Sequence, residues 1–172
     1  IAGTQHDVGK RIDENALALL EPVMAVLRSH GNAPCMIHTN EPVGHAYPGK
    51  TPITAEQIYA LAKAFPANRI ILAHWGGGIF LYNLMKKQVK QTLKNIWLDT
   101  AASPYLYDPA IYDAAACAGM IDKVLFGTDF PLLPPDRYYK ELDRTGLTPE
   151  QKKGVLGKNA RPLFFNPDQR NG

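Results

Sequence analysis

Amphipathic segments and short apolar runs alternate along the whole chain. Residues 13–30 carry apolar side chains at spacings of three and four, which predicts a helix with Asp13 as its N-cap. Thr54 and Gln57 have the spacing of a capping box and predict a second helix that ends near Phe65. By the same reasoning, further helices are predicted over residues 80–93, 108–118, 136–143 and 149–157.

The apolar runs between these helices predict strands. The runs are continuous rather than alternating with polar residues, which is typical of a parallel sheet covered on both faces. Because helices of about 10–15 residues separate the runs, we expect parallel strands joined by right-handed crossovers. The expected strands cover residues 33–38, 69–74, 96–100 and 123–128.

Three of these strands end on a side chain that can bind a metal ion, namely His38, His74 and Asp129. Because the carboxyl ends of parallel strands meet at one edge of the sheet, we expect the three to converge. Imidazole and carboxylate suit zinc, manganese or iron, and a bound ion lowers the pKa of its water toward ~7. A single such residue is more often structural, but three at equivalent positions favour a site.

The glycine run at residues 76–78 has two interpretations. Glycines allow the backbone to turn sharply, so that His74 points inward. Alternatively, backbone N–H groups at a helix start bind anions, as in an open doubly wound sheet with phosphate or sulfate at residues 76–80. We favour the turn.

Several other polar and aromatic residues near the strand ends are candidates for substrate binding. His45 and Lys50 lie in a loop after the first strand and are candidates for contacting a substrate carboxylate. Glu41 is a candidate for supporting a metal ligand, and Trp75 for lining an aromatic pocket. For each of the four, a solvated loop position or ordinary packing is the alternative.

Composition narrows the function class. With 172 residues, we expect residues 1–172 to form one domain, with a frayed polar tail at 166–172. The net charge of +3 is too weak to favour nucleic acid or membrane lipid, so the expected partner is a small-molecule substrate. No apolar run approaches the ~20 residues of a membrane span.

Cysteine usage and the first residues indicate the compartment. Cys35 and Cys117 have no C-x-x-C partner and are expected to be buried free thiols in a reducing cytoplasm. The first residues lack the basic and then apolar pattern of a signal segment. The chain begins at Ile1 rather than Met, so we expect a processed or truncated chain or an isolated domain.

Several segments together resemble the amidohydrolase superfamily, in particular its amidohydrolase-related branch of TIM-barrel metal-dependent hydrolases and decarboxylases. Residues 155–164 resemble the closing helix of that family, and the similarity spans about residues 12–165. The segments are residues 37–42 (IHTNEP), 72–77 (LAHWGG), 125–131 (LFGTDFP) and 155–164 (VLGKNARPLF).

The resemblance implies an α/β fold, the C-terminal part of a TIM-type (β/α)8 barrel whose strands here are the fifth to eighth. It implies that His38 is a metal ligand and that Asp129 is both a ligand and a proton carrier. His74 is then either a second-metal ligand or an acid/base beside the metal-bound water. The implied activity is C–O or C–N hydrolysis, or decarboxylation, of a small carboxylated substrate, with zinc as the most expected metal.

The chain departs from the family pattern in one respect. The first strand of the family carries an H-x-H or E-x-H pair of ligands, and no pair of His residues here has that spacing. A closed barrel takes ~250 residues, so the expected half barrel has open sheet edges. We therefore expect a homo-oligomer, or docking with a missing N-terminal half-barrel. The alternative function is a catalytically silent fragment that acts as a structural or binding domain.

Overall fold

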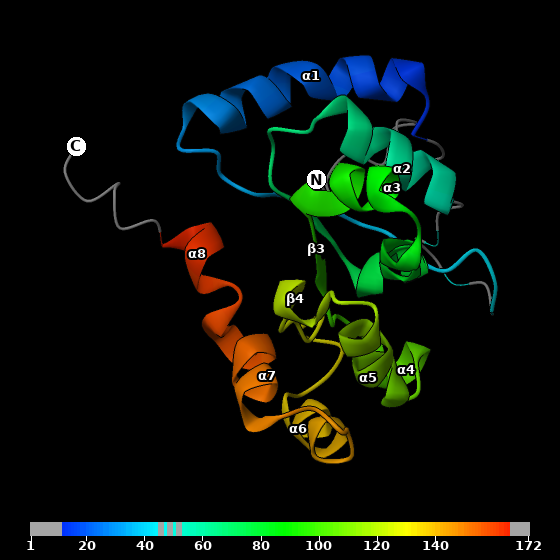
Figure 1. The fold of residues 1–172 in the computed structure, drawn as a ribbon, viewed down its shortest axis with the longest axis vertical. Coiled ribbons are helices and arrows are strands. Elements are labelled where there is room, and N and C mark those ends of the chain that lie inside the picture. The colour runs from blue at the N-terminus through cyan, green and yellow to red at the C-terminus, as the bar shows by residue number, and fades with distance from the viewer. Residues whose placement is uncertain (1–11, 45–46, 48–49, 51–52, 166–172) are drawn as a thin grey trace.

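The computed structural model describes residues 12–44, 47, 50 and 53–165; the tail expected to fray lies outside this part of the chain. The described residues contain a four-stranded sheet in the order β1-β2-β3-β4, and every neighbouring pair is parallel. Helices separate the strands, which confirms the expected α/β class (Figure 1). The strands are shorter than predicted: β1 (Cys35–Ile37), β2 (Ile70–Leu72), β3 (Ile96–Asp99) and β4 (Val124–Leu125).

The first two helices begin where their capping residues predict. Helix α1 (Glu14–Ser29) starts after Asp13, whose Oδ1 accepts a hydrogen bond from the Ala16 N–H at 2.9 Å. Helix α2 (Ala55–Ala64) starts after Thr54, and the capping box with Gln57 is present in both directions. Local side-chain chemistry therefore determines these two helix starts.

The single helix predicted over residues 80–93 is wrong. A 3₁₀ segment, η1 (His74–Leu84), is followed by two residues of extended backbone and then by helix α3 (Lys87–Thr92). The break lets Ile79 and Phe80 pack in the core, whereas α3 has no buried residue. Tertiary packing of the apolar end has overridden the continuous helical pattern.

The C-terminal half of the chain contains mostly short helices. Helix α5 (Ala110–Cys117) has Pro109 rather than Asp108 at its N-cap position, although Asp108 Oδ1 accepts the N–H of Ala110 at 2.9 Å. A short helix also occupies the loop predicted before it. The remaining elements are η2 (Leu93–Asn95), α4 (Ser103–Leu106), α5 (Ala110–Cys117), η3 (Ile121–Lys123), α6 (Asp136–Asp143), α7 (Pro149–Lys153), the π-helical η4 (Gly154–Lys158) and α8 (Arg161–Phe164).

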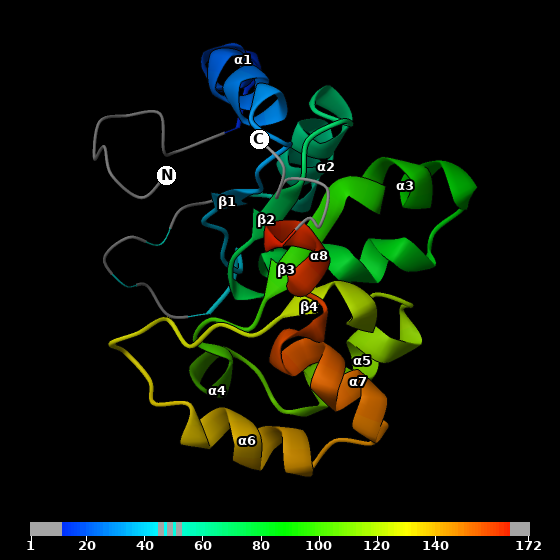
Figure 2. The same cartoon turned by 90° about the vertical axis from the view of Figure 1, so that its left-hand side faces the viewer.

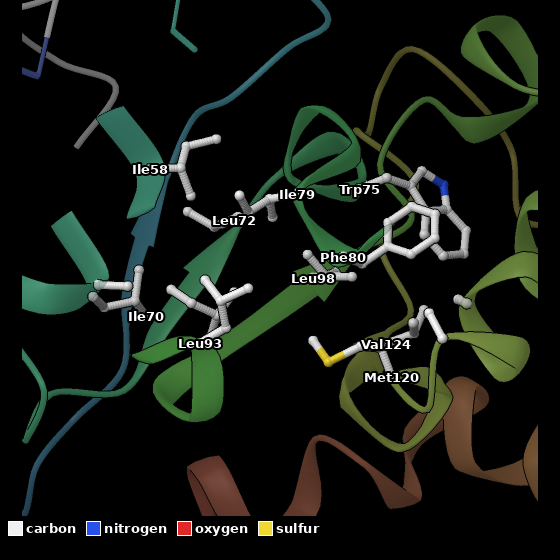
Figure 3. Close-up of a cluster of buried hydrophobic side chains, with 14 of the residues drawn as sticks. Ile58, Ile70, Leu72, Trp75, Ile79, Phe80, Leu93, Leu98, Met120 and Val124 are labelled. Carbon is white, nitrogen blue, oxygen red and sulfur yellow. The ribbon is translucent and has the colours of Figure 1, made fainter. Parts of the chain in front are cut away.

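One face of the sheet carries the main hydrophobic core. Ile70 and Leu72 of β2, with Leu98 of β3 and Val124 of β4, pack against side chains from the helices (Figure 3). Side chains alternate between the two faces along a strand, so these positions share one face. The main core thus lies between the sheet and the helices that connect its strands.

The opposite face of the sheet is covered differently. Ile71 and Leu125 are buried on this face beneath Leu163 of α8, which lies across the sheet in Figure 2. Met36 of β1 is in register with Ile71 but is 49% exposed. The C-terminal helix therefore covers only part of the face.

The C-terminal segment is attached at the amino ends of the strands. Asn159 Nδ2 donates to the carbonyl oxygens of Ile121 and Val124, at 2.9 and 2.8 Å. Arg69, directly before β2, donates from Nη1 to the carbonyl oxygen of Leu163 at 3.2 Å. These bonds place α8 at the end of the sheet opposite to the predicted site.

The two cysteines differ in burial. Both cysteines are free, and Cys35 is buried, but Cys117 at the end of α5 is exposed, so the expectation of two buried thiols is wrong. A position among small residues did not reveal which side of the helix faces the core. In the described part of the chain, no helix has the length and apolar character needed to cross a membrane.

Replacing Asn159 by Ala tests the attachment of the C-terminal segment. The Asn159→Ala change removes one hydrogen bond from each of two carbonyl groups, although that of Ile121 keeps its bond from the Val124 N–H. We expect a loss of about 1–3 kcal/mol in the free energy of unfolding. Urea denaturation measures the loss. The control is Lys158→Ala, next in sequence but exposed and paired with the exposed Glu150, for which we expect little change. Equal effects of the two substitutions would contradict the assigned role.

Candidate active site

The chain turns in a left-handed conformation directly after β2. His74, Trp75 and the three glycines that follow all have positive φ, between 54° and 86°. A Cβ on Gly76 would lie 2.8 Å from Ile79, and a Cβ on Gly77 would lie 2.8 Å from the carbonyl oxygen of Asn40. Residues 76–78 therefore form a turn rather than the start of a regular helix, which supports the turn interpretation of the glycine run.

His74 is held in this turn at both its main chain and its ring. Its N–H donates to Asp99 Oδ1 at 2.9 Å, and its Nδ1 lies 2.9 Å from the carbonyl oxygen of Ala101. Because a carbonyl oxygen only accepts, the hydrogen bond requires the proton on Nδ1. In the neutral ring, Nε2 then carries the free lone pair. The side chain is 7% exposed, so the ring is nearly enclosed by protein.

The structure brings the other two strand-end residues to the same place. The rings of His38 and His74 are 4.9 Å apart between centroids, at 78°. Desolvation by surrounding protein lowers the pKa of His38, and the neighbouring His74 acts in the same direction. The nearby carboxylate of Asp129 opposes this shift by raising the pKa. Asp129 itself has a φ of 59° and is exposed at the surface.

The fit of a metal ion to these side chains is incomplete. Two imidazoles and a carboxylate are suitable donors for zinc, manganese or iron. Within residues 12–44, 47, 50 and 53–165, however, no group of three or more His, Cys, Asp or Glu side chains is arranged to hold an ion. His38, His74 and Asp129 therefore form a partial donor set and do not by themselves complete a metal centre.

Glu41 lies at the rim of this cluster. Its carboxylate accepts a hydrogen bond from the hydroxyl of Tyr107, whose pKa is raised by burial first and by this bond second. Burial also raises the pKa of Tyr47, and the charges of Glu41 and Asp129 add to the shift. The rim is thus lined by tyrosine hydroxyls next to two carboxylates.

The remaining candidate residues for substrate binding lie in different environments. Lys50 Nζ donates to the carbonyl oxygen of Val43 and lies 5.8 Å from the centroid of the Tyr47 ring. Its contact with a substrate carboxylate stays a prediction. His45 lies outside the described residues.

Trp75 is fully buried, in agreement with the packing alternative. Its Nε1 donates to Ser103 Oγ at 3.0 Å, and its ring meets that of Tyr112 edge to face, with centroids 4.9 Å apart. Figure 3 shows the indole beside Phe80 in the core. A residue at this position is not accessible for lining a substrate pocket, and it fixes the turn that carries His74.

Sequence reasoning missed Asp99 and Thr100 at the end of β3. The Asp99 carboxyl is 5% exposed; burial raises its pKa, while the N–H groups of Ala101 and His74 oppose the shift. Thr100 Oγ1 donates to the carbonyl oxygen of Gly127 at 2.9 Å and lies 3.1 Å from its N–H. The signal that identified the other three residues, a polar side chain ending an apolar run, was present here too.

Comparison with known families gives one match. A sequence model of the family described as Amidohydrolase matches residues 1–165. A search of curated proteins gives no match.

Solved structures are similar to this chain in fold. The 5-carboxyvanillate decarboxylase of Sphingomonas paucimobilis has a TM-score of 0.69 at 16% identity, over 94% of this chain and 56% of that one. A dihydroxybenzoic acid decarboxylase of Polaromonas sp. JS666, with bound manganese and the inhibitor 2-nitroresorcinol, has a TM-score of 0.61 at 19% identity, over 90% and 55%. An uncharacterized TIM-barrel protein of Bordetella bronchiseptica has a TM-score of 0.62 at 22% identity, over 89% and 51%.

These similarities confirm the predicted architecture. Four parallel strands alternate with helices, and the similar structures include a TIM-barrel protein, as expected for part of a (β/α)8 barrel. The chain spans about half the length of these solved structures. At such low identities, the similarity in structure establishes the fold alone.

A pair of alanine substitutions tests the close approach at the turn. Gly77 and Gly78 both have positive φ, but only a Cβ at Gly77 meets backbone atoms, those of Asn40. We expect Gly78→Ala to cost about 1–2 kcal/mol through the left-handed conformation alone. Gly77→Ala should cost about 1–3 kcal/mol more through overpacking. Denaturant unfolding of both variants measures the difference, and equal losses would refute a close approach at Gly77.

Proposed function

The chain belongs to the amidohydrolase family, and we propose that it supplies part of the active site of a hydrolase or decarboxylase acting on a small carboxylated substrate. The observation that carries this proposal is the convergence of His38, His74 and Asp129 at the carboxyl end of the sheet. Decarboxylases among the solved structures of the same fold support the choice of reaction class.

The proposed chemistry follows from the protonation states. His74, with its proton on Nδ1, accepts a proton at Nε2. In hydrolysis it takes that proton from the attacking water, and the leaving group is protonated as the C–O or C–N bond breaks. In decarboxylation the C–C bond breaks, CO₂ leaves, and an acid protonates the carbon. Asp129, at the surface beside His38, is the proposed proton carrier in either reaction.

A divalent ion is part of this proposal, with zinc expected and manganese or iron as alternatives. Its general role would be to lower the pKa of a bound water. His38 and Asp129 are the proposed protein donors in this chain. His74 has one free lone pair, on Nε2, and that lone pair would either bind an ion or accept the proton, not both. Since the described residues do not group three donors around one point, the proposal requires donors from outside the described residues.

The second candidate function is a catalytically silent structural or binding domain. The incomplete donor set is the observation that favours it. Metal analysis distinguishes the two functions, because a silent domain needs no stoichiometric ion.

Assembly and location are also proposals. We propose self-association or docking with an N-terminal half-barrel, since Met36 leaves part of one sheet face exposed. Light scattering that shows a clean monomer of the purified chain would count against self-association. A cytoplasmic location is consistent with two free cysteines, and fractionation of the producing cells would test it.

Substitution of Asp129 tests the catalytic assignment. Asp129→Asn keeps the shape of the side chain but removes its ability to accept and carry a proton. We expect kcat to fall by about 10²–10⁴-fold, with KM nearly unchanged and the fold intact. Steady-state turnover of small aromatic carboxylates measures the effect. Asp143→Asn, at the exposed end of α6, is the control, and unchanged turnover in Asp129→Asn would refute the role.

Removal of metal tests the proposed cofactor. Dialysis against a chelator should abolish turnover, and addition of zinc or manganese should restore it, because the donor atoms at His38 and Asp129 suit these ions. Elemental analysis before and after dialysis, run in parallel with the turnover assay, measures the dependence. Full activity in protein shown to be free of metal would contradict the metal requirement.

A further inference from the structure

We propose that Asp99 is a positioning residue: its carboxylate fixes the tautomer and the orientation of His74. The inference rests on the proposed function only for its catalytic consequence, since the geometry stands without it. Asp99 ends β3, next to the strand that carries His74, and is nearly fully buried. Nothing in the proposed proton transfer uses this carboxylate directly.

The carboxylate joins two parts of the site through one oxygen. Asp99 Oδ1 accepts the N–H of His74 at 2.9 Å and the N–H of Ala101 at 3.0 Å. The first bond holds the main chain of a residue with a φ of 54°, a conformation that costs energy for any residue except glycine. The second bond holds the segment after β3 close to the same point.

The consequence for the imidazole follows from the second bond. Asp99 holds Ala101 through the Ala101 N–H. The carbonyl oxygen of Ala101 in turn accepts a hydrogen bond from His74 Nδ1–H at 2.9 Å. The carboxylate therefore positions both the backbone of His74 and the acceptor that selects the tautomer of its ring. Loss of Oδ1 would leave two buried N–H groups without an acceptor, and the turn and the carbonyl would both shift.

The same segment also reaches toward Asp129. Thr100 lies between Asp99 and Ala101. Its Oγ1 donates to the carbonyl oxygen of Gly127 and accepts the N–H of the same residue, which is two residues before Asp129. A Cβ built on Gly127 would lie 3.6 Å from the side chain of Asp99. Residues 99–101 thus align the turn of His74 with the strand end that leads to Asp129.

Two substitutions separate hydrogen bonding from charge. Asp99→Asn retains an oxygen that accepts both N–H bonds, whereas Asp99→Ala removes the acceptor. Nitrogen NMR of the imidazole rings at alkaline pH reports the tautomer, with the His74 signals assigned by their loss in His74→Gln. We expect one Nδ1–H tautomer in the unsubstituted protein and in Asp99→Asn. In Asp99→Ala we expect a mixture of tautomers and loss of exchange protection at the His74 amide.

Controls guard against a general loss of structure. Asp143→Ala, an exposed carboxylate on α6, should leave the His74 signals unchanged. If Asp99→Ala does not fold, Asp99→Leu removes the acceptor while nearly filling the same volume. An Nε2–H tautomer in the unsubstituted protein overturns the proposal, and so does an unchanged Nδ1–H tautomer in a folded variant without the acceptor.

Turnover distinguishes the positioning role of Asp99 from its consequence for catalysis. For Asp99→Ala we expect kcat to fall by about 10–100-fold with little change in KM, as for groups that orient a catalytic side chain. Asp99→Asn should recover most of the activity. A tautomer change in a protein without any turnover would defeat the proposed function and leave the positioning role intact. Full turnover in Asp99→Ala with an altered tautomer would refute the catalytic consequence.

Discussion

The left-handed turn at residues 74–78 is the constraint on which both the core and the candidate site depend. Consecutive positive φ angles are costly for residues with a Cβ, and two of the five residues here, His74 and Trp75, carry one. The cost is offset by burial of the Trp75 indole in the core and by the bond from His74 N–H to Asp99. The same turn therefore points one side chain into the core and its neighbour into the site.

The two ends of the sheet differ in the contacts that their side chains make. At the carboxyl ends, polar side chains gather in a cluster that is only partly enclosed, since His38 and Asp129 remain exposed. At the amino ends, Asn159 donates to carbonyl groups of η3 and β4, and Arg69 donates to a carbonyl group of α8. These bonds attach the C-terminal segment to the sheet. This division places the polar cluster on loops supported by the sheet, the arrangement in which parallel α/β enzymes hold their functional residues.

The partly covered sheet face relates the fold to the proposed function. Leu163 buries Ile71 and Leu125, but Met36 beside them stays exposed. In a closed barrel that face is the filled interior. Among the described residues, the donor set at the carboxyl end of this same sheet is incomplete.

Much of the architecture was predictable because local chemistry determines it. Asp13 and Thr54 cap their helices through bonds within four residues, and the continuous apolar runs mark parallel strands wherever both faces are covered. The positions of His38, His74 and Asp129 at strand ends also predicted their convergence, because parallel strands share one carboxyl edge. The roles of these residues in metal binding and catalysis stay predictions.

Contacts between distant segments decided the rest. The break between η1 and α3 depends on Ile79 and Phe80 reaching the core, and the exposure of Cys117 depends on which side of α5 meets it. The role of Asp99 depends on a bond to a residue 25 positions earlier in the chain. The sequence by itself determined the order of strands and helices and the end of the sheet where polar groups meet. Only the tertiary structure decided which of those groups face each other, because strand pairing sets the distances between side chains that the chain itself leaves far apart.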